Sequence, residues 1–492
     1  MTDVLYIHPA RHAVDSGYQD LGFYFLIPVG VIGLANMLRR QGYQVKGINY
    51  PAELLRDRSF KLKPWLKEQQ GVRLVMVDLH WFEHAFGAIS VARICREVFP
   101  NARIVLGGFT ASIYASEILQ SFPEVDFVIR GDAELPLTRL MAELTRPDPD
   151  LSTIPNLSYR KRDQVIENAL TYCATSAEID ALDFVDLEFL EHADWYGTLQ
   201  FEPTNLTRTM SGLRGHWLCI GRGCLFDCAF CGGGKESHRL LAGREQVTLR
   251  AVERVVEDIV RLAHRGIDQV ALNLDPAIFE ESYWRALFAG LRQRHVRIGI
   301  YNEHFQLPSL EFVRDFAETV DISRSEVALT LLSGSERVRR NNGKFFSNKH
   351  LYPVLSVLAQ VGMPLYVYFS FNLPGEDERS FRETLHLAEE IARMYPPHLL
   401  KMINQAHTLD PCCPISREPG RFSVQVTLRR FKDYYSYCQK TLAFGPDEVS
   451  PWQERGFTWR TRSDGVLESM VRQWNAFCSR QRFLCFRVPQ SW

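Results

Sequence analysis

The sequence predicts an α/β protein, and three observations predict that class. Short apolar runs alternate with amphipathic helices over the first 145 residues. A second series of strand and helix units covers about residues 211–415. Between the two series a compact cysteine motif directly follows an apolar strand. Because strands that are apolar on both faces need helices on both sides, the pattern indicates parallel sheets.

The first series predicts a doubly wound parallel sheet. The strands are expected at 3–9, 45–50, 73–80, 102–108 and 125–131, and helices at 28–45, 88–99 and 114–122. Ligands of such sheets bind at the carboxyl ends of the strands. These ends here read "HPARH", "DLHWFEH", "GGFTAS" and "RGDAE".

The cysteine motif is "RGCLFDCAFCGGG", which places Cys224, Cys228 and Cys231 within one short loop. A four-iron cluster usually receives one thiolate on each iron. Three cysteines at this spacing would hold three irons and leave the fourth open for a substrate or cosubstrate. A structural zinc site is the alternative, but it usually takes four ligands in two pairs. No second pair is evident, and Cys219 on the preceding strand is expected to be a core residue.

Composition and charge narrow the function classes. The formal net charge of −1 gives no electrostatic footprint for nucleic acid. No secretory signal precedes the first strand, and no uncharged apolar run reaches the length of about 18 residues that spans a bilayer. We therefore expect a cytoplasmic protein without a membrane partner. Thiols stay reduced there, which favours metal ligands over disulfides.

The second series predicts six parallel strands with outer helices. Besides the strand before the cysteines, strands are expected at 268–276, 296–305, 326–335, 364–376 and 398–411. Functional groups belong at the carboxyl ends of such strands. Asp275 could instead cap a helix, and Glu303 with His304 could form an ion pair at the barrel mouth. The polar residues at these ends are Asn273, Asp275, Asn302, Glu303 and His304.

Several segments resemble class B radical SAM enzymes, the cobalamin-dependent family. "IPVGVIGLANMLRRQGYQV", "IVLGGFTASIYASEIL" and "VDFVIRGDAELPLTRLM" are similar to the cobalamin-binding domain, and the cysteine loop is similar to the radical SAM motif. "SGSERVRRNNGK" and "NLPGEDERSFRETL" resemble the fourth-strand and fifth-strand loops of that family. The resemblance implies a Rossmann-like cobalamin-binding domain at 1–150, a connector with a hairpin at 151–210, a partial (β/α)6 TIM barrel at 211–415, and a helical region at 416–492 that covers the barrel mouth.

The resemblance also implies three cofactors: a [4Fe-4S] cluster on the three cysteines, S-adenosyl-L-methionine (SAM), and cobalamin, as methylcobalamin. The pattern Asp-x-His-x-x-Gly is absent, which implies cobalamin without a protein histidine on cobalt. Leu332 stands where many relatives have a glutamate that holds SAM. The implied cofactor-binding residues are Pro28, His80, Gly107, Gly108, Phe109, Thr110 and Gly131 at the first sheet, and Phe230, Gly232, Gly233, Asn273, Asp275, Asn302 and Ser333 at the barrel.

The family resemblance predicts a C-methyltransferase of natural-product biosynthesis. A 5'-deoxyadenosyl radical would abstract hydrogen from a substrate carbon, and methylcobalamin would methylate it. Glu303 and His304 are the candidate catalytic residues if a base is needed. The expected partners are a small-molecule or carrier-bound substrate and an electron donor such as flavodoxin or ferredoxin.

Two other activities stay open. The first is a non-methylating oxidation, cyclisation or rearrangement with the same cofactors. The second is a radical SAM enzyme whose N-terminal domain no longer binds cobalamin. The sequence assigns no role to the adjacent cysteines Cys412 and Cys413.

Overall fold

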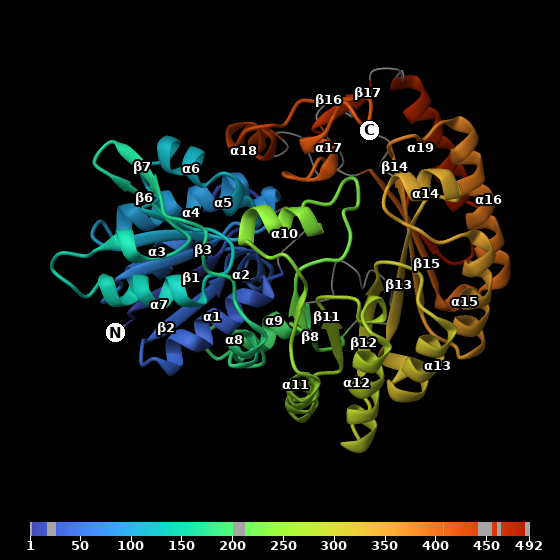
Figure 1. The fold of residues 1–492 in the computed structure, drawn as a ribbon, viewed down its shortest axis with the longest axis horizontal. Helices are drawn as coiled ribbons and strands as arrows, with labels where there is room; N and C mark the ends of the chain where they lie inside the picture. Colours follow the sequence, from blue (N-terminus) through green and yellow to red (C-terminus); the bar gives the residue numbers. More distant parts are fainter. Residues whose placement is uncertain are drawn as a thin grey trace.

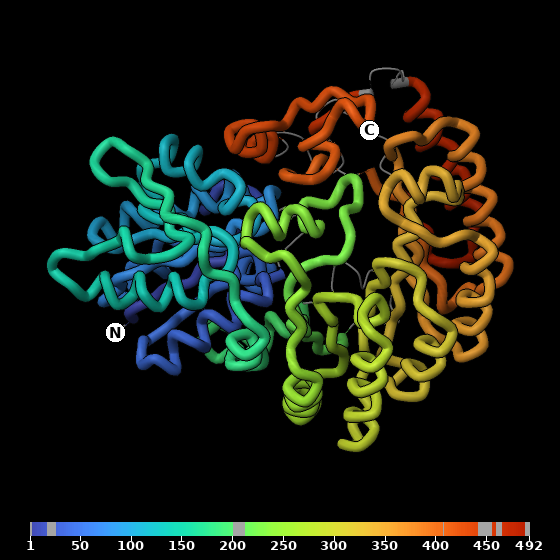
Figure 2. The backbone as a smooth tube through the Cα atoms, in the orientation of Figure 1, coloured from blue at the N-terminus to red at the C-terminus, as the bar shows by residue number. Residues whose placement is uncertain are grey.

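Two seven-stranded β-sheets lie side by side in the chain, and the cysteine loop lies between them (Figure 1). The computed structural model of the protein describes residues 2–16, 26–199, 212–406, 408–440, 455–459 and 464–487 of the 492-residue sequence. The segment from β8 to α10 separates the N-terminal unit from the other strands and helices of the second unit (Figure 2). The predicted α/β class is confirmed.

The first sheet has the strand order β2-β1-β3-β4-β5-β6-β7. Its first five strands pair in parallel, and the chain direction reverses only at β6 and β7. The hairpin expected in the connector therefore extends the first sheet. The strands are β1 (Val4–His8), β2 (Val45–Asn49), β3 (Leu74–Asp78), β4 (Arg103–Gly107), β5 (Phe127–Ile129), β6 (Leu157–Lys161) and β7 (Gln164–Glu167).

Helices cover both faces of the first sheet because neighbouring strand residues point to opposite sides. Leu5 and Ile7 of β1 belong to one buried cluster, and Val4 and Tyr6 belong to another on the opposite face. The elements of this unit are α1 (Val29–Arg40), α2 (Tyr50–Arg56), α3 (Leu62–Lys67), η1 (Phe82–His84), α4 (Ala85–Val98), α5 (Phe109–Ile113), α6 (Ala115–Ser121) and α7 (Glu134–Glu143).

The second sheet is parallel throughout, in the order β18-β15-β14-β13-β12-β11-β8. Strands lie at the six predicted places, and the two-residue β18 joins them without having been predicted. Within the described residues β8 does not pair with β18, so this sheet stays open. The strands are β8 (Gly215–Leu218), β11 (Gln269–Leu272), β12 (Gly299–His304), β13 (Glu326–Leu332), β14 (Leu365–Phe371), β15 (Leu400–Ala406) and β18 (Leu484–Cys485).

The outer side of the second sheet carries the largest buried cluster of the described chain, formed by apolar strand residues and the helices that follow each strand. The helices of this unit are α11 (Val252–His264), η3 (Pro276–Ile278), α12 (Glu281–Gln293), α13 (Leu310–Thr319), η4 (Ile322–Arg324), α14 (Glu336–Asn341), α15 (Asn348–Gln360), α16 (Glu378–Met394) and η5 (Pro397–Leu399); α14 contributes instead to a smaller cluster with Leu332 and Leu373. The connector contains η2 (Leu151–Thr153), α8 (Ser176–Asp180) and α9 (Ala193–Leu199).

The C-terminal region contacts both units. α18 (Phe431–Lys440) packs on the first, where Cys438 Sγ donates a hydrogen bond to the Phe82 carbonyl at 3.3 Å. α19 (Asp464–Cys478) buries Trp474 against Phe369 of β14, with 5.9 Å between ring centroids. The described aromatic residues of both helices therefore contribute to the protein core. The remaining elements are α17 (Pro414–Arg417), β16 (Val424–Val426) and β17 (Phe457–Trp459).

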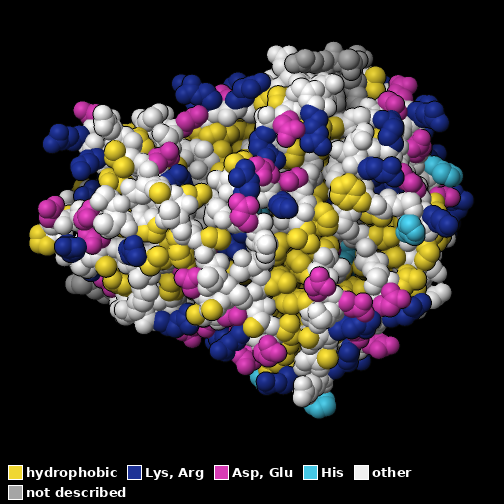
Figure 3. Space-filling view, viewed as in Figure 1, with side chains coloured by type: hydrophobic (Ala, Val, Ile, Leu, Met, Phe, Trp, Pro, Cys, Tyr) yellow, Lys and Arg dark blue, Asp and Glu magenta, His cyan; other side chains and the backbone are white. Residues whose placement is uncertain are grey.

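Charges of both signs are interspersed over the face of the molecule seen in Figure 3. Among the described residues no helix combines the length and the hydropathy needed to cross a bilayer.

Candidate functional site

A cavity of about 750 Å³ lies between the two units. Its walls come from the carboxyl ends of the first sheet, from the cysteine loop and from the carboxyl ends of the second sheet. Parallel sheets leave their functional groups at these ends. Of the residues predicted from sequence, the lining includes Pro28, His80, Gly107, Gly108, Phe109, Gly131, Cys224, Cys228, Phe230, Cys231, Gly233, Asn273 and Glu303.

The cysteine loop is held at its base by a short antiparallel ribbon of β9 (Gly221–Arg222) and β10 (Thr248–Leu249). Between these strands the chain forms the loop and then α10 (Lys235–Ala242). Inside the loop, Cys231 N donates a hydrogen bond to the Cys228 carbonyl at 3.1 Å. Phe226 N donates to Cys224 Sγ at 3.5 Å. The β9–β10 pairing thus holds both ends of this segment, and the three cysteine side chains line one cavity.

Another chain segment supports the loop from the far side. A Cβ on Gly343 would lie 2.9 Å from Cys228 Cα, a contact that a larger residue could not make. The φ of Gly343 is +89°, which also favours glycine. Lys344 follows, and its Nζ donates to the Phe305 carbonyl at 2.6 Å while its side chain lines the cavity. A buried cation therefore lies beside the cysteines.

The three thiols are neutral in the metal-free chain. Burial raises the pKa of Cys224, Cys228 and Cys231, and for Cys231 the nearby Asp410 carboxylate raises it further. The positive charge of Lys344 opposes this shift at Cys228. A metal group must therefore displace protons from these thiols when it binds.

The cysteine geometry favours a group larger than one ion. In the described chain, the three sulfurs do not form a set of atoms within 4.8 Å of one another, as one set of histidine and carboxylate atoms elsewhere does. Four thiolates around zinc lie less than about 4 Å apart, since each Zn–S bond is about 2.3 Å. Cys219 is 1% exposed and donates to the Gly221 carbonyl at 3.5 Å, so it offers no fourth ligand. The residues fit a multi-iron cluster better than a single zinc ion.

At the first sheet, close backbone packing explains two glycines. Gly108 has φ +107°, and a Cβ there would lie 2.7 Å from the His80 backbone. Gly131 has φ +65°, and a Cβ there would lie 2.8 Å from Ala242 Cα on α10. Gly107 has open space around its Cα, where the nearest atom to a Cβ would be 4.0 Å away. Of these three glycines, only Gly107 has room for a Cβ.

Aromatic rings line the junction between the first sheet and α10. His80 stacks edge-on against Phe109 at 5.3 Å, and Phe109 does the same against His238 at 4.9 Å. Burial lowers the pKa of His80 to about 4 and that of His238 to about 4. Both imidazoles are therefore neutral at pH 7. Thr110 lies behind this surface, where its Oγ1 donates to the His80 carbonyl at 3.0 Å.

Arg222 links the two units beside the cavity. Its Nη1 donates to Asp132 Oδ1 at 2.9 Å, and its Nη2 donates to Glu134. Arg244 donates to the other oxygen of Asp132. Burial alone would raise the pKa of Asp132, but the two guanidinium groups lower it below its ordinary value. These charges fix the cysteine loop against the end of β5.

Strand alternation separates three neighbouring residues of β12. Glu303 faces the cavity, and its Oε1 accepts a hydrogen bond from Thr330 Oγ1 at 2.9 Å. Asn302 and His304 point the opposite way, into the core beneath the helices, where the His304 ring lies 5.4 Å from that of Phe312. The apolar Ile300 has the same phase as these two residues, a signal that sequence reasoning could have used.

Asp275 also lies outside the cavity and is fully buried. Its carboxylate accepts from Ala277 N at 3.0 Å and from Phe305 N at 2.9 Å, and it contacts His304 Nδ1 at 3.1 Å. Asp275 therefore caps η3, one of the two roles that the sequence left open for it. A buried pair forms between His304 and Asp275, and not between His304 and Glu303.

Of the other residues that the family resemblance implied at the barrel, some line the cavity and others do not. Asn273 lines the cavity. Its Oδ1 accepts a hydrogen bond from Ile220 N at 2.8 Å, which holds the segment before the cysteine loop in place. Gly232 N donates to Asp410 at 3.0 Å, away from the cavity lining. Ser333 is buried against α16 and hydrogen-bonds Thr384 at 3.0 Å. Leu332 has φ +62° and packs in an apolar cluster with Phe230.

The adjacent cysteines lie in the loop after β15. Cys413 is fully buried in an apolar cluster that also contacts Phe230. The Cys412 carbonyl accepts a hydrogen bond from Ser237 Oγ at 3.1 Å. Neither residue lines the cavity.

Sequence reasoning missed several cavity residues. All but Trp217 belong to segments quoted in the sequence analysis, but the family resemblance assigned these positions no role. They are Asp78, Asp132, Glu134, Trp217, Arg222 and Lys344.

Comparison with known proteins agrees with this architecture. Residues 218–388 match the family described as "Radical SAM superfamily". The fold is similar to that of TsrM from Kitasatospora setae, a radical S-adenosylmethionine methyltransferase solved with cobalamin and a [4Fe-4S] cluster. The TM-score is 0.63 at 14% identity, covering 88% of this chain and 83% of that one.

Two curated relatives share distant sequence similarity with this chain. An uncharacterized methyltransferase of Pyrococcus horikoshii is 22% identical over 372 residues, which is 74% of this chain and 73% of that protein. The anaerobic magnesium-protoporphyrin IX monomethyl ester cyclase of Synechocystis sp. is 26% identical over 137 residues, which is 28% of this chain and only 24% of the cyclase. The chain thus contains a radical SAM domain in residues 218–388, as the cysteine motif predicted.

Proposed function

We propose that this chain is a cobalamin-dependent radical SAM C-methyltransferase that acts on a small-molecule or carrier-bound substrate. One observation carries the proposal: the cysteine loop and the carboxyl ends of the first sheet line the same cavity. A radical methylase needs both cofactors within reach of one substrate. The fold similarity to TsrM over most of both chains supports the same assignment.

Cys224, Cys228 and Cys231 would hold a [4Fe-4S] cluster with one open iron. When bound, the cluster and SAM would supply a radical that abstracts hydrogen, and cobalamin would supply the methyl group. Phe230 and Gly233 border the cysteines, so they would line the SAM side of the cavity. The ammonium group of Lys344 supplies a positive charge for the carboxylate of SAM.

The first sheet would hold cobalamin at its carboxyl edge. Pro28, His80, Gly107 and Phe109 line this part of the cavity, and the open side of Gly107 lets a ligand approach the backbone. The imidazole of His80 is neutral at pH 7, because burial lowers its pKa to about 4. A neutral imidazole costs less to bury beneath a large apolar ring system than a charged one.

Glu303 is the proposed acid–base group on the substrate side. It lines the cavity, and its hydrogen bond from Thr330 fixes the carboxylate orientation. Asn302, Asp275, Ser333 and His304 are not retained as substrate or cofactor contacts, because none of them lines the cavity.

The proposal is tested by anaerobic reconstitution of the full chain with iron, sulfide and hydroxocobalamin. We expect about four irons per chain, corrin that persists through gel filtration, and reductive release of 5'-deoxyadenosine from SAM. The triple variant Cys224→Ala/Cys228→Ala/Cys231→Ala should lose the iron, and Cys95→Ala, at a buried thiol in α4, should keep it. Corrin that washes out would contradict the methylase, even if the cluster forms.

A second activity is supported by the curated cyclase relative of Synechocystis sp.. The same cofactors could then drive oxidation, cyclisation or rearrangement of the substrate without methyl transfer. Product mass separates the two activities when SAM carries a ¹³C-labelled methyl group. A labelled product supports methylation, and an unlabelled, oxidised or cyclised product supports the alternative.

A further inference from the structure

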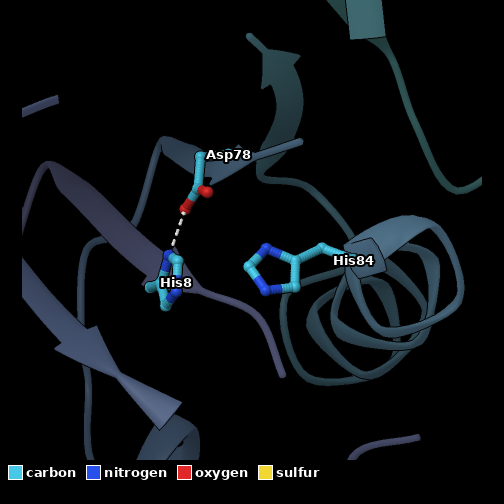
Figure 4. A group of neighbouring side chains, drawn as sticks. All are labelled: His8, Asp78 and His84. Carbon is cyan, nitrogen blue, oxygen red and sulfur yellow. Dashed lines mark hydrogen bonds and ion pairs between the residues drawn. The ribbon is translucent and has the colours of Figure 1, made fainter. Parts of the chain in front are cut away.

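Three metal-ligating side chains lie close together where β1 and β3 of the first sheet end (Figure 4). They are His8 at the end of β1, Asp78 at the end of β3 and His84 in η1, and one ligand atom of each lies within 4.8 Å of the others. All three are buried, at 0%, 4% and 1% exposure. In the described chain no other group of three histidine, cysteine or carboxylate side chains is this close.

The spacing of these atoms suits a single metal ion. Zinc lies about 2.0–2.2 Å from nitrogen and oxygen ligands, so two ligand atoms of a tetrahedral site are about 3.4 Å apart. The His8–Asp78 contact is shorter, with Nδ1 and Oδ1 2.9 Å apart. The His84 ring presents its nitrogen-bearing edge to the other two side chains (Figure 4). Small side-chain movements would bring all three atoms to bonding distance.

The carboxylate has the support that a metal ligand usually has. Tyr6 Oη donates to Asp78 Oδ1 at 2.7 Å, which fixes the plane of the carboxylate. The other oxygen, Oδ2, is buried, and within the described residues it has no hydrogen-bond partner. A buried carboxylate oxygen without a partner is costly. Asp78 also lines the cavity, so an ion could reach this oxygen from there.

We propose that His8, Asp78 and His84 bind one divalent transition-metal ion of the zinc class. Two imidazoles and one carboxylate suit zinc, iron(II) or cobalt(II), whereas magnesium and calcium prefer oxygen ligands. Three protein ligands leave a coordination position for water or another small ligand. The ion would link the carboxyl ends of β1 and β3 to η1. This site is separate from the cysteine cluster and does not rest on the proposed methyltransferase activity.

The test uses the full-length Cys224→Ala/Cys228→Ala/Cys231→Ala variant, so that zinc cannot bind to the cluster cysteines. After chelation, the protein is dialysed against zinc chloride, and bound zinc is measured by atomic emission. We expect about one zinc per chain and a melting temperature that rises with zinc. Absorption of the cobalt(II) form should show ligand-field bands without thiolate charge transfer.

Ligand variants in the same background assign the zinc to these residues. His84→Phe and Asp78→Asn should weaken zinc binding by about 100-fold or more. His304→Gln is the matched control: His304 also contacts a buried aspartate, Asp275 at 3.1 Å, and among the described residues no third metal ligand joins this pair. Circular dichroism checks that each variant is folded, and His84→Gln replaces His84→Phe if the latter is not.

Either of two results would overturn the site. One is the absence of tightly bound zinc in the Cys224→Ala/Cys228→Ala/Cys231→Ala variant. The other is equal zinc binding by the folded His84 variant and by its parent.

Discussion

Arg222 Nη1 lies 2.9 Å from Asp132 Oδ1, and this contact joins the strand before the three cysteines to the loop after β5. The side chains of Arg222 and Asp132 are only 16% and 9% exposed. The same guanidinium reaches Glu134 at the start of α7. Arg222 therefore helps to set the relative position of the cysteine loop and the first sheet, together with Arg244, which donates to the other oxygen of Asp132.

Replacing Arg222 by methionine should destabilise the protein by about 3 kcal/mol, because it leaves the buried Glu134 carboxylate without its cation. Urea unfolding measures the loss. Arg254→Met is the control, since Arg254 pairs with Glu257 at the surface and should contribute less than about 1 kcal/mol. Equal losses in the two variants would show that the Arg222 contact is unimportant.

Gly108→Ala should cost about 2–4 kcal/mol. The residue combines φ +107° with a Cβ position 2.7 Å from the His80 backbone, so both strain and overlap oppose a methyl group. Gly197→Ala in α9 is the comparison, because nothing lies within 4 Å of a Cβ there. That change should be neutral or stabilise by up to about 1 kcal/mol. A Gly108 variant as stable as the parent would contradict the packing described here.

Asp275→Asn and Glu303→Gln should separate stability from activity. The first change disturbs a fully buried hydrogen-bonded group and should lower the free energy of unfolding by about 2–3 kcal/mol, with iron content per folded chain unchanged. The second removes charge at the cavity and should alter substrate turnover, with a stability change near 1 kcal/mol or less. Thermal unfolding and iron analysis of both proteins test this. Loss of iron in folded Asp275→Asn would place Asp275 at the cluster.

The stability of the protein should fall between about pH 5 and pH 8 because of Glu83. Burial, and then the charge of Asp410, raise the pKa of Glu83 to about 8. The native state thus holds a proton that the unfolded state loses above about pH 4.5, so unfolding becomes easier as pH rises. Glu83→Gln should flatten this slope and gain about 1–2 kcal/mol at pH 8. The exposed Glu253→Gln should leave it unchanged, and an equal slope in Glu83→Gln would contradict the assignment.

Local sequence patterns predicted most strands, but they could not predict contacts between residues far apart in the sequence. The apolar runs gave both parallel sheets because each strand is buried on both faces. The antiparallel β6–β7 pair was seen only as a hairpin, since nothing local tells which sheet edge it joins. The strand β18 was not predicted because two residues carry no periodicity. Its pairing with β15 is a long-range contact, like the packing of the preceding α19 on α16.

In the candidate site, too, local motifs were predictable from the sequence and long-range contacts were not. The cysteines and the glycine pair belong to motifs, whereas Asp132 and Arg222 are 90 positions apart and meet only in the fold. Similarly, Asn302, Glu303 and His304 are equivalent as strand-end polar residues, and only the phase of the strand decides which one reaches the cavity.

Electron paramagnetic resonance tests most directly whether one cavity holds both cofactors. The relaxation of the cob(II)alamin signal is compared before and after reduction of the cluster in the reconstituted protein. We predict faster relaxation after reduction, because two paramagnets that share a cavity of about 750 Å³ must couple. A cob(II)alamin signal that does not respond to cluster reduction, or that is lost on gel filtration, would contradict the account.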